Sequence, residues 1–370
     1  MKKIKLKKAV IGIVGFFLIF LSITPFSAYG AEEETDYMAE ITEELEDILS
    51  DYDIGFEMED LTDLSFQKIL SGVWRSVSAR LEAPVGILAA LFLVIVFNSL
   101  ASSAGITAEK NSANMYNMVC VMAAVTVTVP QLMAVYGEIL QTIRVTGSFI
   151  LVFVPVLTAA SIAAGGFTTA GVYHIMMLGA SEIIVKLSES YLLPILGATA
   201  ALGVTGSVFP SASLESFINL IKKLITWGIS ITMTLFTGFV SLKCTITGKA
   251  DGAVAKTAKM LVSGCVPIVG GAVSDAYSTV RGSFDVIGGT VGAAGIVAIV
   301  ILLLPGIIEI LVYRAVMWIG SAAADVFSAA SLSKLLKSID SGLAIAQSVL
   351  VCYSIMFILC SAILMKTFGG

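Results

Sequence analysis

Apolar stretches of about 20 residues dominate the chain from residue 84 to residue 365, and short polar or glycine-containing connections separate them. A helix of about 20 apolar residues crosses the hydrocarbon layer of a bilayer. The pattern therefore predicts an all-α protein, a polytopic transmembrane helical bundle of about seven to nine spans. The expected spans are 84–104, 115–136, 145–165, 170–187, 190–208, 224–242, 288–312, 315–332 and 343–365.

One apolar stretch, residues 264–281, is poorly suited to a uniform transmembrane helix. Pro267 lacks a backbone donor, and Asp275 places a carboxylate in apolar surroundings. The Gly270–Gly271 pair loosens the backbone between them. Irregular backbone at membrane depth persists only where protein or a wet cavity covers it. We therefore expect a broken or re-entrant segment at the centre of the bundle.

Three stretches, 154–159, 193–198 and 266–271, share the order apolar-Pro-apolar-apolar-small-small. Proline-interrupted segments in corresponding positions are typical of transporters built from internal repeats. The alternative is that proline, glycine and alanine are common in membrane helices, where small residues allow close packing. The stretches begin 39 and then 73 residues apart. This unequal spacing favours the alternative.

The first 30 residues have the pattern of a cleavable signal peptide. Five lysines among the first eight residues precede an apolar core at 9–23, and Ala28 and Gly30 supply small residues before the cut. The alternative is a retained first helix, although the apolar run is short and ends at Pro25. In either case the residues that follow begin on the extracytoplasmic side.

Two amphipathic segments follow. Residues 31–60 are acidic, with apolar residues at helical spacing, and form either a docking helix for an extracytoplasmic partner or a solvated leader. Residues 61–82 combine an apolar face containing Trp74 with scattered basic residues. Such a helix beside a membrane span lies in the interface plane. Residues 83–370 form the expected permease-like membrane domain.

Composition supports the membrane assignment. Hydrophobic residues make up 57% of the chain and charged residues 13%, compared with about 25% charged residues in soluble domains. The net charge of −5 is local, because residues 31–67 contain fifteen of the 27 acidic residues and no lysine or arginine. We therefore expect the lipid bilayer, and no nucleic acid, as a partner. The lysine-rich connection at 243–259 would be cytoplasmic by the positive-inside rule, but the span count leaves its side open.

Ionisable residues in apolar spans are costly and are candidates for function. We predict path-lining or gating roles for six residues of the membrane domain: Pro267, Gly270, Gly271, Asp275, Glu309 and Asp325. The alternative is that each carboxylate has a structural role and is paired with a basic or hydroxyl side chain inside the bundle. The i,i+4 pair Glu182–Lys186 and the single histidine, His174, are expected to be structural, the latter as a hydrogen-bonded residue.

The sequence argues against an enzyme. A single histidine and five cysteines without ligand spacing predict no metal site and no cofactor. Lys249 follows Gly248 but precedes Ala250, so the P-loop pattern for ATP is incomplete.

Residues 266–276, Val-Pro-Ile-Val-Gly-Gly-Ala-Val-Ser-Asp-Ala, resemble the stage III sporulation protein AE family of endospore-forming bacteria. The order of signal peptide, acidic leader, basic amphipathic stretch and polytopic core extends the resemblance over nearly the full length. It implies a permease-like component of the membrane complex that joins mother cell and forespore. In that family the protein works beside a separate ATPase and ring-forming membrane partners. It sustains forespore development and late forespore gene expression, and the resemblance implies no catalytic residues.

Three functions therefore compete. The first is a non-enzymatic channel subunit, multi-pass in the mother-cell membrane around the forespore, whose broken segment 264–281 lines the path. The second is a stand-alone secondary transporter that couples ions through Asp275, Glu309 or Asp325. The third is a structural platform that recruits partners through residues 31–82. Each is compatible with a homo-oligomer.

Overall fold

The computed structural model describes residues 81–103, 110–208, 214–265 and 270–368, although not the side chains at several helix ends. These residues belong to one compact unit, 45–370, and the first unit, 1–44, lies outside the described residues. The expected signal peptide (1–30), acidic leader (31–60) and nearly all of the interfacial helix (61–82) also lie outside them.

Every element in the described ranges is helical, as the apolar pattern predicts, and none of these ranges contains a strand. The elements in order are α5 Glu82–Ser103, α6 Lys110–Ala163, α7 Phe167–Leu187, the π-helical turn η1 Ser188–Leu192, α8 Leu193–Val208, α9 Leu214–Cys265, α10 Gly270–Val326 and α11 Ala330–Phe368. An all-α bundle is therefore confirmed.

The described residues contain six helices long and apolar enough to cross a membrane, rather than seven to nine spans. They are 82–101, 115–163, 167–208, 216–257, 278–326 and 330–366. Three pairs of expected spans are merged: 115–136 with 145–165, 170–187 with 190–208, and 288–312 with 315–332. The separate boundaries predicted for these pairs, and with them the span count, are therefore not confirmed.

The merging has a local physical reason. The connection 137–144 contains glutamate, glutamine and arginine, which favour helix, and only Tyr313 and Arg314 separate the last pair of expected spans. Polarity alone does not end a helix. Pro194 is the one strong helix breaker between 187 and 208, and the π-turn η1 lies directly before it. A π-turn changes the hydrogen-bond register, which accommodates a proline that cannot donate.

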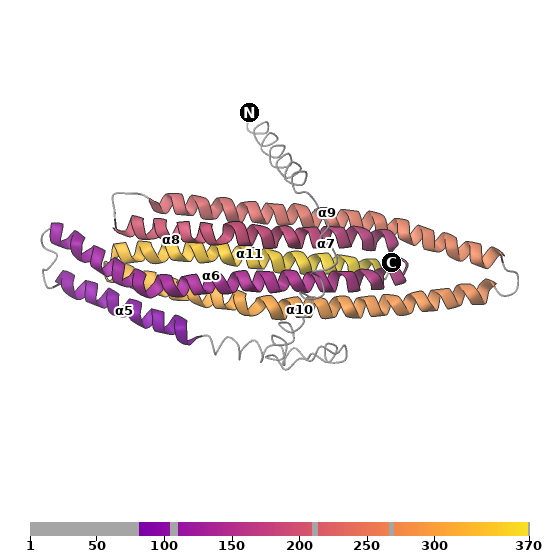
Figure 1. The fold of residues 1–370 in the computed structure, drawn as a ribbon, viewed down its shortest axis with the longest axis horizontal. Helices are drawn as coiled ribbons and strands as arrows, with labels where there is room; N and C mark the ends of the chain where they lie inside the picture. The colour runs from indigo at the N-terminus through magenta and orange to yellow at the C-terminus, as the bar shows by residue number, and fades with distance from the viewer. Residues whose placement is uncertain (1–80, 104–109, 209–213, 266–269, 369–370) are drawn as a thin grey trace, which may run out of the picture. The chain divides into compact units, whose positions relative to one another are not determined.

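Helix α11 lies inside the bundle and contacts five other helices, α6, α7, α8, α9 and α10 (Figure 1). Its contact with α7 contains two fully buried tyrosines with satisfied hydroxyls, Tyr353 on α11 and Tyr173 on α7. The Tyr353 hydroxyl lies 2.6 Å from Ser181 Oγ, and the Tyr173 hydroxyl lies 3.0 Å from Ser361 Oγ. Buried hydroxyls need such partners, so these pairs fix the register of α7 against α11.

Small residues let the long helices approach closely. A Cβ atom on Gly295 of α10 would lie 2.0 Å from the ring of Phe153 on α6. That ring stacks on Phe149 at 5.3 Å between centroids and lies 6.0 Å from Phe357 of α11. The absence of a side chain at residue 295 therefore creates the space for the aromatic contact between α6, α10 and α11.

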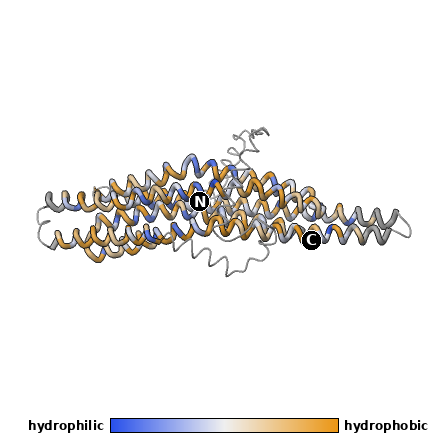
Figure 2. Tube along the Cα trace, turned by 60° about the horizontal axis from the view of Figure 1, so that its bottom comes forward, coloured by the Kyte–Doolittle hydropathy of each residue, from blue (hydrophilic) through white to orange (hydrophobic). Residues whose placement is uncertain are grey.

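The helices are long relative to a bilayer. Helix α6 has 54 residues, which corresponds to about 81 Å, whereas the hydrocarbon layer is about 30 Å thick. Figure 2 shows hydrophobic residues along most of the helices, interrupted by short hydrophilic stretches. Part of each long helix must therefore lie outside the hydrocarbon layer of a single membrane.

Candidate functional site

The predicted segment 264–281 joins two long helices. Helix α9 ends at Cys265 and α10 begins at Gly270, so the helix break coincides with the turn between them. This turn lies between the candidate spans 216–257 and 278–326, and outside both. A re-entrant segment at the centre of the bundle is therefore not confirmed. Pro267 lies outside the described residues, as do the side chains of Asp275 and its neighbours 270–274.

Glu309 lies within the bundle. It is half-buried on α10, and α10 continues as a helix through Pro305, four residues earlier. Glu309 and Glu138 of α6 both interact electrostatically with Tyr313, which is buried. The structure thus brings two carboxylates to the α6–α10 contact, of which sequence reasoning identified only Glu309.

Asp325 lies at the end of α10, where the chain turns into α11. Its carboxylate Oδ2 is 2.9 Å from Lys337 Nζ, and about half of each side chain is exposed. The structure therefore places Asp325 in the paired, structural arrangement that was the alternative to a path-lining role.

The two interactions expected to be structural are present. Lys186 Nζ lies 2.5 Å from Glu182 Oε1 on the exposed face of α7. His174 Nδ1 lies 3.3 Å from Thr158 Oγ1 of α6. Both expected interactions are therefore present.

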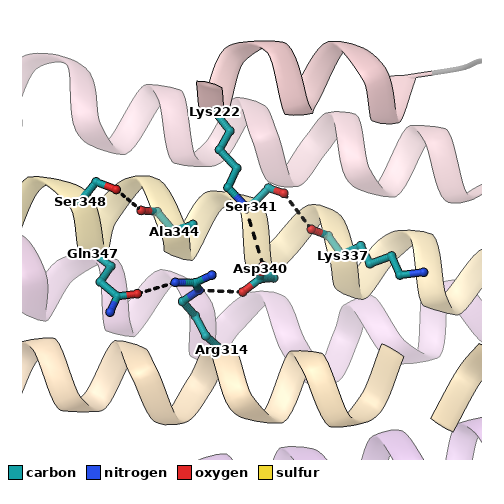
Figure 3. A network of polar contacts seen from close by, with 8 residues as sticks. All are labelled: Lys222, Arg314, Lys337, Asp340, Ser341, Ala344, Gln347 and Ser348. Atoms are coloured by element: carbon teal, nitrogen blue, oxygen red, sulfur yellow. Dashed lines mark hydrogen bonds and ion pairs between the residues drawn. The ribbon is translucent and has the colours of Figure 1, made fainter. Parts of the chain in front are cut away.

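The most extensive charged contact between helices was not predicted. Arg314 of α10 donates from Nε to Asp340 Oδ1 at 2.7 Å and from Nη1 to Gln347 Oε1 at 2.5 Å. Lys222 of α9 approaches the other carboxylate oxygen, Oδ2, at 4.0 Å. Figure 3 shows Arg314 and Lys222 reaching Asp340 on α11 from opposite sides. We call Lys222, Arg314, Asp340 and Gln347 the charged network.

The charged network lies in the membrane-spanning helices and connects three of them. Asp340 is its most buried charged member, with 13% of its side chain exposed, compared with 33% for Arg314 and 31% for Lys222. A charge in such a position is stable only when paired. Arg314 lies in an apolar run, so it could have been identified as Glu309 was, as an ionisable residue within an apolar stretch. Its partner Asp340, on an amphipathic part of α11, gave no comparable signal.

A second polar contact connects α9 to the first turn of α7. Asp251 is buried and accepts hydrogen bonds from the backbone amides of Thr168 at 3.2 Å and Thr169 at 2.9 Å. It also accepts a bond from the Thr169 hydroxyl at 2.8 Å. The first amides of a helix have no intrahelical partner. Asp251 therefore caps α7 from another helix, since Gly166 at the N-cap has no side chain.

An apolar cavity of about 410 Å³ lies between the middle of α9 and the rest of the bundle. It lies between α7, η1 and α8 on one side and α9 on the other, with α11 at its base. The π-turn residues Ser188, Tyr191 and Leu192 line it, so the irregular turn in the helix borders the open space. Among the described residues, no three His, Cys, Asp or Glu side chains gather where a metal ion could bind.

Two comparisons relate the chain to known proteins. The sequence profile of the stage III sporulation protein AE family matches residues 53–367. The chain is also similar to "Stage III sporulation protein AE" of Bacillus subtilis (strain 168), with 24% identity over 160 residues. That match covers 43% of this chain and 40% of the relative, well under two thirds of its length. No solved structure matches.

Since the family profile matches most of the chain, including every described helix, the protein belongs to the stage III sporulation protein AE family and has a role in sporulation.

Proposed function

We propose that the protein is a permease-like membrane subunit of the sporulation channel or secretion complex that links mother cell and forespore. It would lie in the mother-cell membrane around the forespore and support forespore development and late forespore gene expression. The observation that carries the proposal is the family match over residues 53–367. The six long apolar helices support a membrane-embedded subunit.

The proposed partners are a separate ATPase and ring-forming membrane subunits of the same complex. The incomplete P-loop pattern around Lys249 is consistent with this division of labour, because an ATPase on another chain would supply the energy. The proposal includes no cofactor and no catalytic residue.

The transport path is proposed to run along the polar contacts between helices. The charged network and the two carboxylates beside Tyr313, Glu138 and Glu309, support this, because ionisable groups inside membrane helices mark the routes of ions and polar substrates. Segment 264–281, which includes the start of α10 with Gly270, Gly271 and Asp275, would serve as a gate at one end of the α9–α10 pair.

A stand-alone secondary transporter is the second candidate function. The charged network favours it, since one carboxylate, Asp340, is shared by two cationic side chains on different helices. Such a carboxylate can couple ion binding to a helix movement. A structural platform would depend instead on residues 31–82.

A pull-down of the tagged full-length protein from detergent-solubilised sporulating cells tests the proposal. We expect an ATPase and ring-forming membrane proteins to copurify, and an unrelated tagged multi-pass protein from the same cells to recover neither. If the protein is recovered alone and stable, the channel-subunit proposal is wrong. Solute uptake by the purified protein in liposomes, lost in the Asp340→Asn variant, would then establish the transporter.

A further inference from the structure

The middle of helix α9 packs loosely against the bundle and contacts α11 at Ser230, which hydrogen-bonds Cys352. Between the buried residues Ile218 and Val240, none of the side chains at 219–239, all of which are described, is buried. Near the start of this stretch Lys222 contacts Asp340, and beyond its end Asp251 caps α7. The apolar cavity lies under the unburied stretch.

The lining of the cavity is almost entirely hydrocarbon. Ser188, Tyr191 and Thr232 supply its few polar atoms, and the remaining lining side chains are aliphatic, apart from Gly228. The lining residues Tyr191 and Leu224 are also exposed, so the cavity opens to the outside of the bundle. The surrounding helices are candidate membrane spans, and within a bilayer this opening would face the lipid layer.

One end of the cavity is cationic. Helices α9 and α11 run in the same direction (Figure 1). On α9, Lys222 and Lys223 immediately precede the lining residues that begin at Leu224. On α11, Asp340 lies five residues before the lining residue Ile345. The charged network therefore lies at the same end on both helices.

This end has an excess of positive charge. Lys222 and Arg314 share a single carboxylate, Asp340, which already binds Arg314 at 2.7 Å, and the exposed Lys223 adds a further positive charge beside Lys222. Lys222 is 4.0 Å from that carboxylate, at the limit of an ion pair, and is partly exposed. Its ammonium group can therefore bind a second anion without breaking the Arg314–Asp340 pair.

We propose that the cavity binds an anionic phospholipid, with an acyl chain between α8, α9 and α11 and its phosphate at Lys222 and Lys223. Apolar lining, a lateral opening to lipid and a cationic end match the two parts of such a molecule. A transmembrane helix of a partner is a poorer match. Such a helix is about 30 Å long, whereas the lining residues of α9, 224–233, span about 15 Å.

The test uses native mass spectrometry of the purified full-length protein. The protein is incubated in mixed micelles with phosphatidylglycerol, with phosphatidylcholine of the same acyl chains, or with inorganic phosphate. We expect at least tenfold more retained phosphatidylglycerol than phosphatidylcholine, and no displacement by phosphate at equal concentration. Equal retention of both lipids, or full displacement by phosphate, would overturn the proposal.

Matched variants locate the site. Gly228→Phe fills the cavity, whereas Gly238→Phe adds the same ring ten residues along α9, at a glycine that does not line it. We expect at least fivefold less retained phosphatidylglycerol for Gly228→Phe and no change for Gly238→Phe. Ile229→Trp is a second cavity-filling variant if Gly228→Phe does not purify as a monodisperse protein. Wild-type retention in the folded cavity variants would exclude the cavity.

Charge variants test the headgroup contact. The double change Lys222→Gln and Lys223→Gln should abolish the preference for phosphatidylglycerol while phosphatidylcholine retention stays unchanged. Lys243→Gln is the control, because Lys243 is also on α9 but lies over the Phe239 ring, away from the cavity. An unchanged lipid preference in the double variant would contradict the proposed phosphate position.

Discussion

The exposure of an ion pair decides how much the pair contributes to stability, and the hairpin of α10 and α11 contains one exposed and one more buried pair. Asp325–Lys337 and Asp340–Arg314 have similar distances, 2.9 and 2.7 Å. The Asp325 side chain is 53% exposed and that of Asp340 is 13% exposed. Water screens the first pair, while the second depends on its partner for charge compensation.

We expect Asp340→Asn to lower the free energy of unfolding by about 3 kcal/mol, because it leaves Arg314 partly buried without a counter-charge. Thermal unfolding of the detergent-solubilised protein measures the change. The control Asp325→Asn should cost about 0–1 kcal/mol. Equal costs for the two variants would show that the charged network does not stabilise the bundle.

At the scale of the elements, one polar side chain attaches the start of α7 to α9. Helix α7 starts at Phe167 after a short turn in which Gly165 has a positive φ of 88°. That turn offers no capping side chain, and Asp251 of α9 supplies the acceptors for the amides of Thr168 and Thr169. The start of α7 is therefore coupled to the position of α9.

Replacing Asp251 by alanine should uncap α7 at a cost of about 1–2 kcal/mol. Hydrogen exchange followed by mass spectrometry should show faster exchange at residues 167–172 in Asp251→Ala. Thr257→Ala is the control, because the Thr257 hydroxyl donates to the Ala253 carbonyl of its own helix, at 2.9 Å. Unchanged protection of the α7 start would mean that Asp251 is not its cap.

The close approach of α6 and α10 at Gly295 leaves no room for a side chain there. Gly295→Ala should destabilise the protein by about 1–3 kcal/mol, because its Cβ would collide with the Phe153 ring, which two other phenylalanines hold in place. Gly289→Ala, on the same helix with open space around it, should be neutral or stabilising by about 0.5–1 kcal/mol. Thermal unfolding compares the two, and a neutral Gly295→Ala would contradict the close approach.

Continuous helices dominate at the scale of the whole molecule. Candidate spans of 49 residues, such as 115–163 and 278–326, are more than twice as long as a bilayer requires. Two apolar halves flank a polar stretch in α6, where Glu138 and Arg144 lie, and Arg144 pairs with Glu189 of η1 at 2.6 Å. The polar stretches of neighbouring helices therefore meet at similar depth.

Spin labels can distinguish one long α6 from two spans folded as a hairpin. Labels at the exposed positions Val119 and Leu151 should lie about 48 Å apart in a continuous helix and about 20 Å apart in a hairpin. Double electron–electron resonance measures the distance in a variant whose five native cysteines are replaced.

A second label pair controls for local distortion. Leu151 and Ile162, both exposed, lie in the same half of α6 and should be about 17 Å apart in either arrangement. A short distance between residues 119 and 151 together with an unchanged control distance would show that α6 folds back at its polar stretch.

The sequence by itself determined the fold class and the family. Apolar stretches and a low charge content require a lipid environment, and every hydrogen bond of a helix is local, so an all-helical membrane protein follows from pattern alone. The Glu182–Lys186 ion pair was predictable for the same reason, because the two residues are one helical turn apart. The helix ends around residues 266–269 were also predictable, because proline and glycine act on the local backbone.

Only the tertiary structure decided how far each helix continues and which charges meet. The polar stretch at 137–144 resembled a loop in the hydropathy pattern, but its residues favour helix and the packing of α6 keeps it continuous. Arg314 and Asp340 are 26 residues apart, and Thr169 and Asp251 are 82 apart. Such partners lie on different helices, so no local pattern links them. Packing brings them together, and their burial makes the pairing necessary.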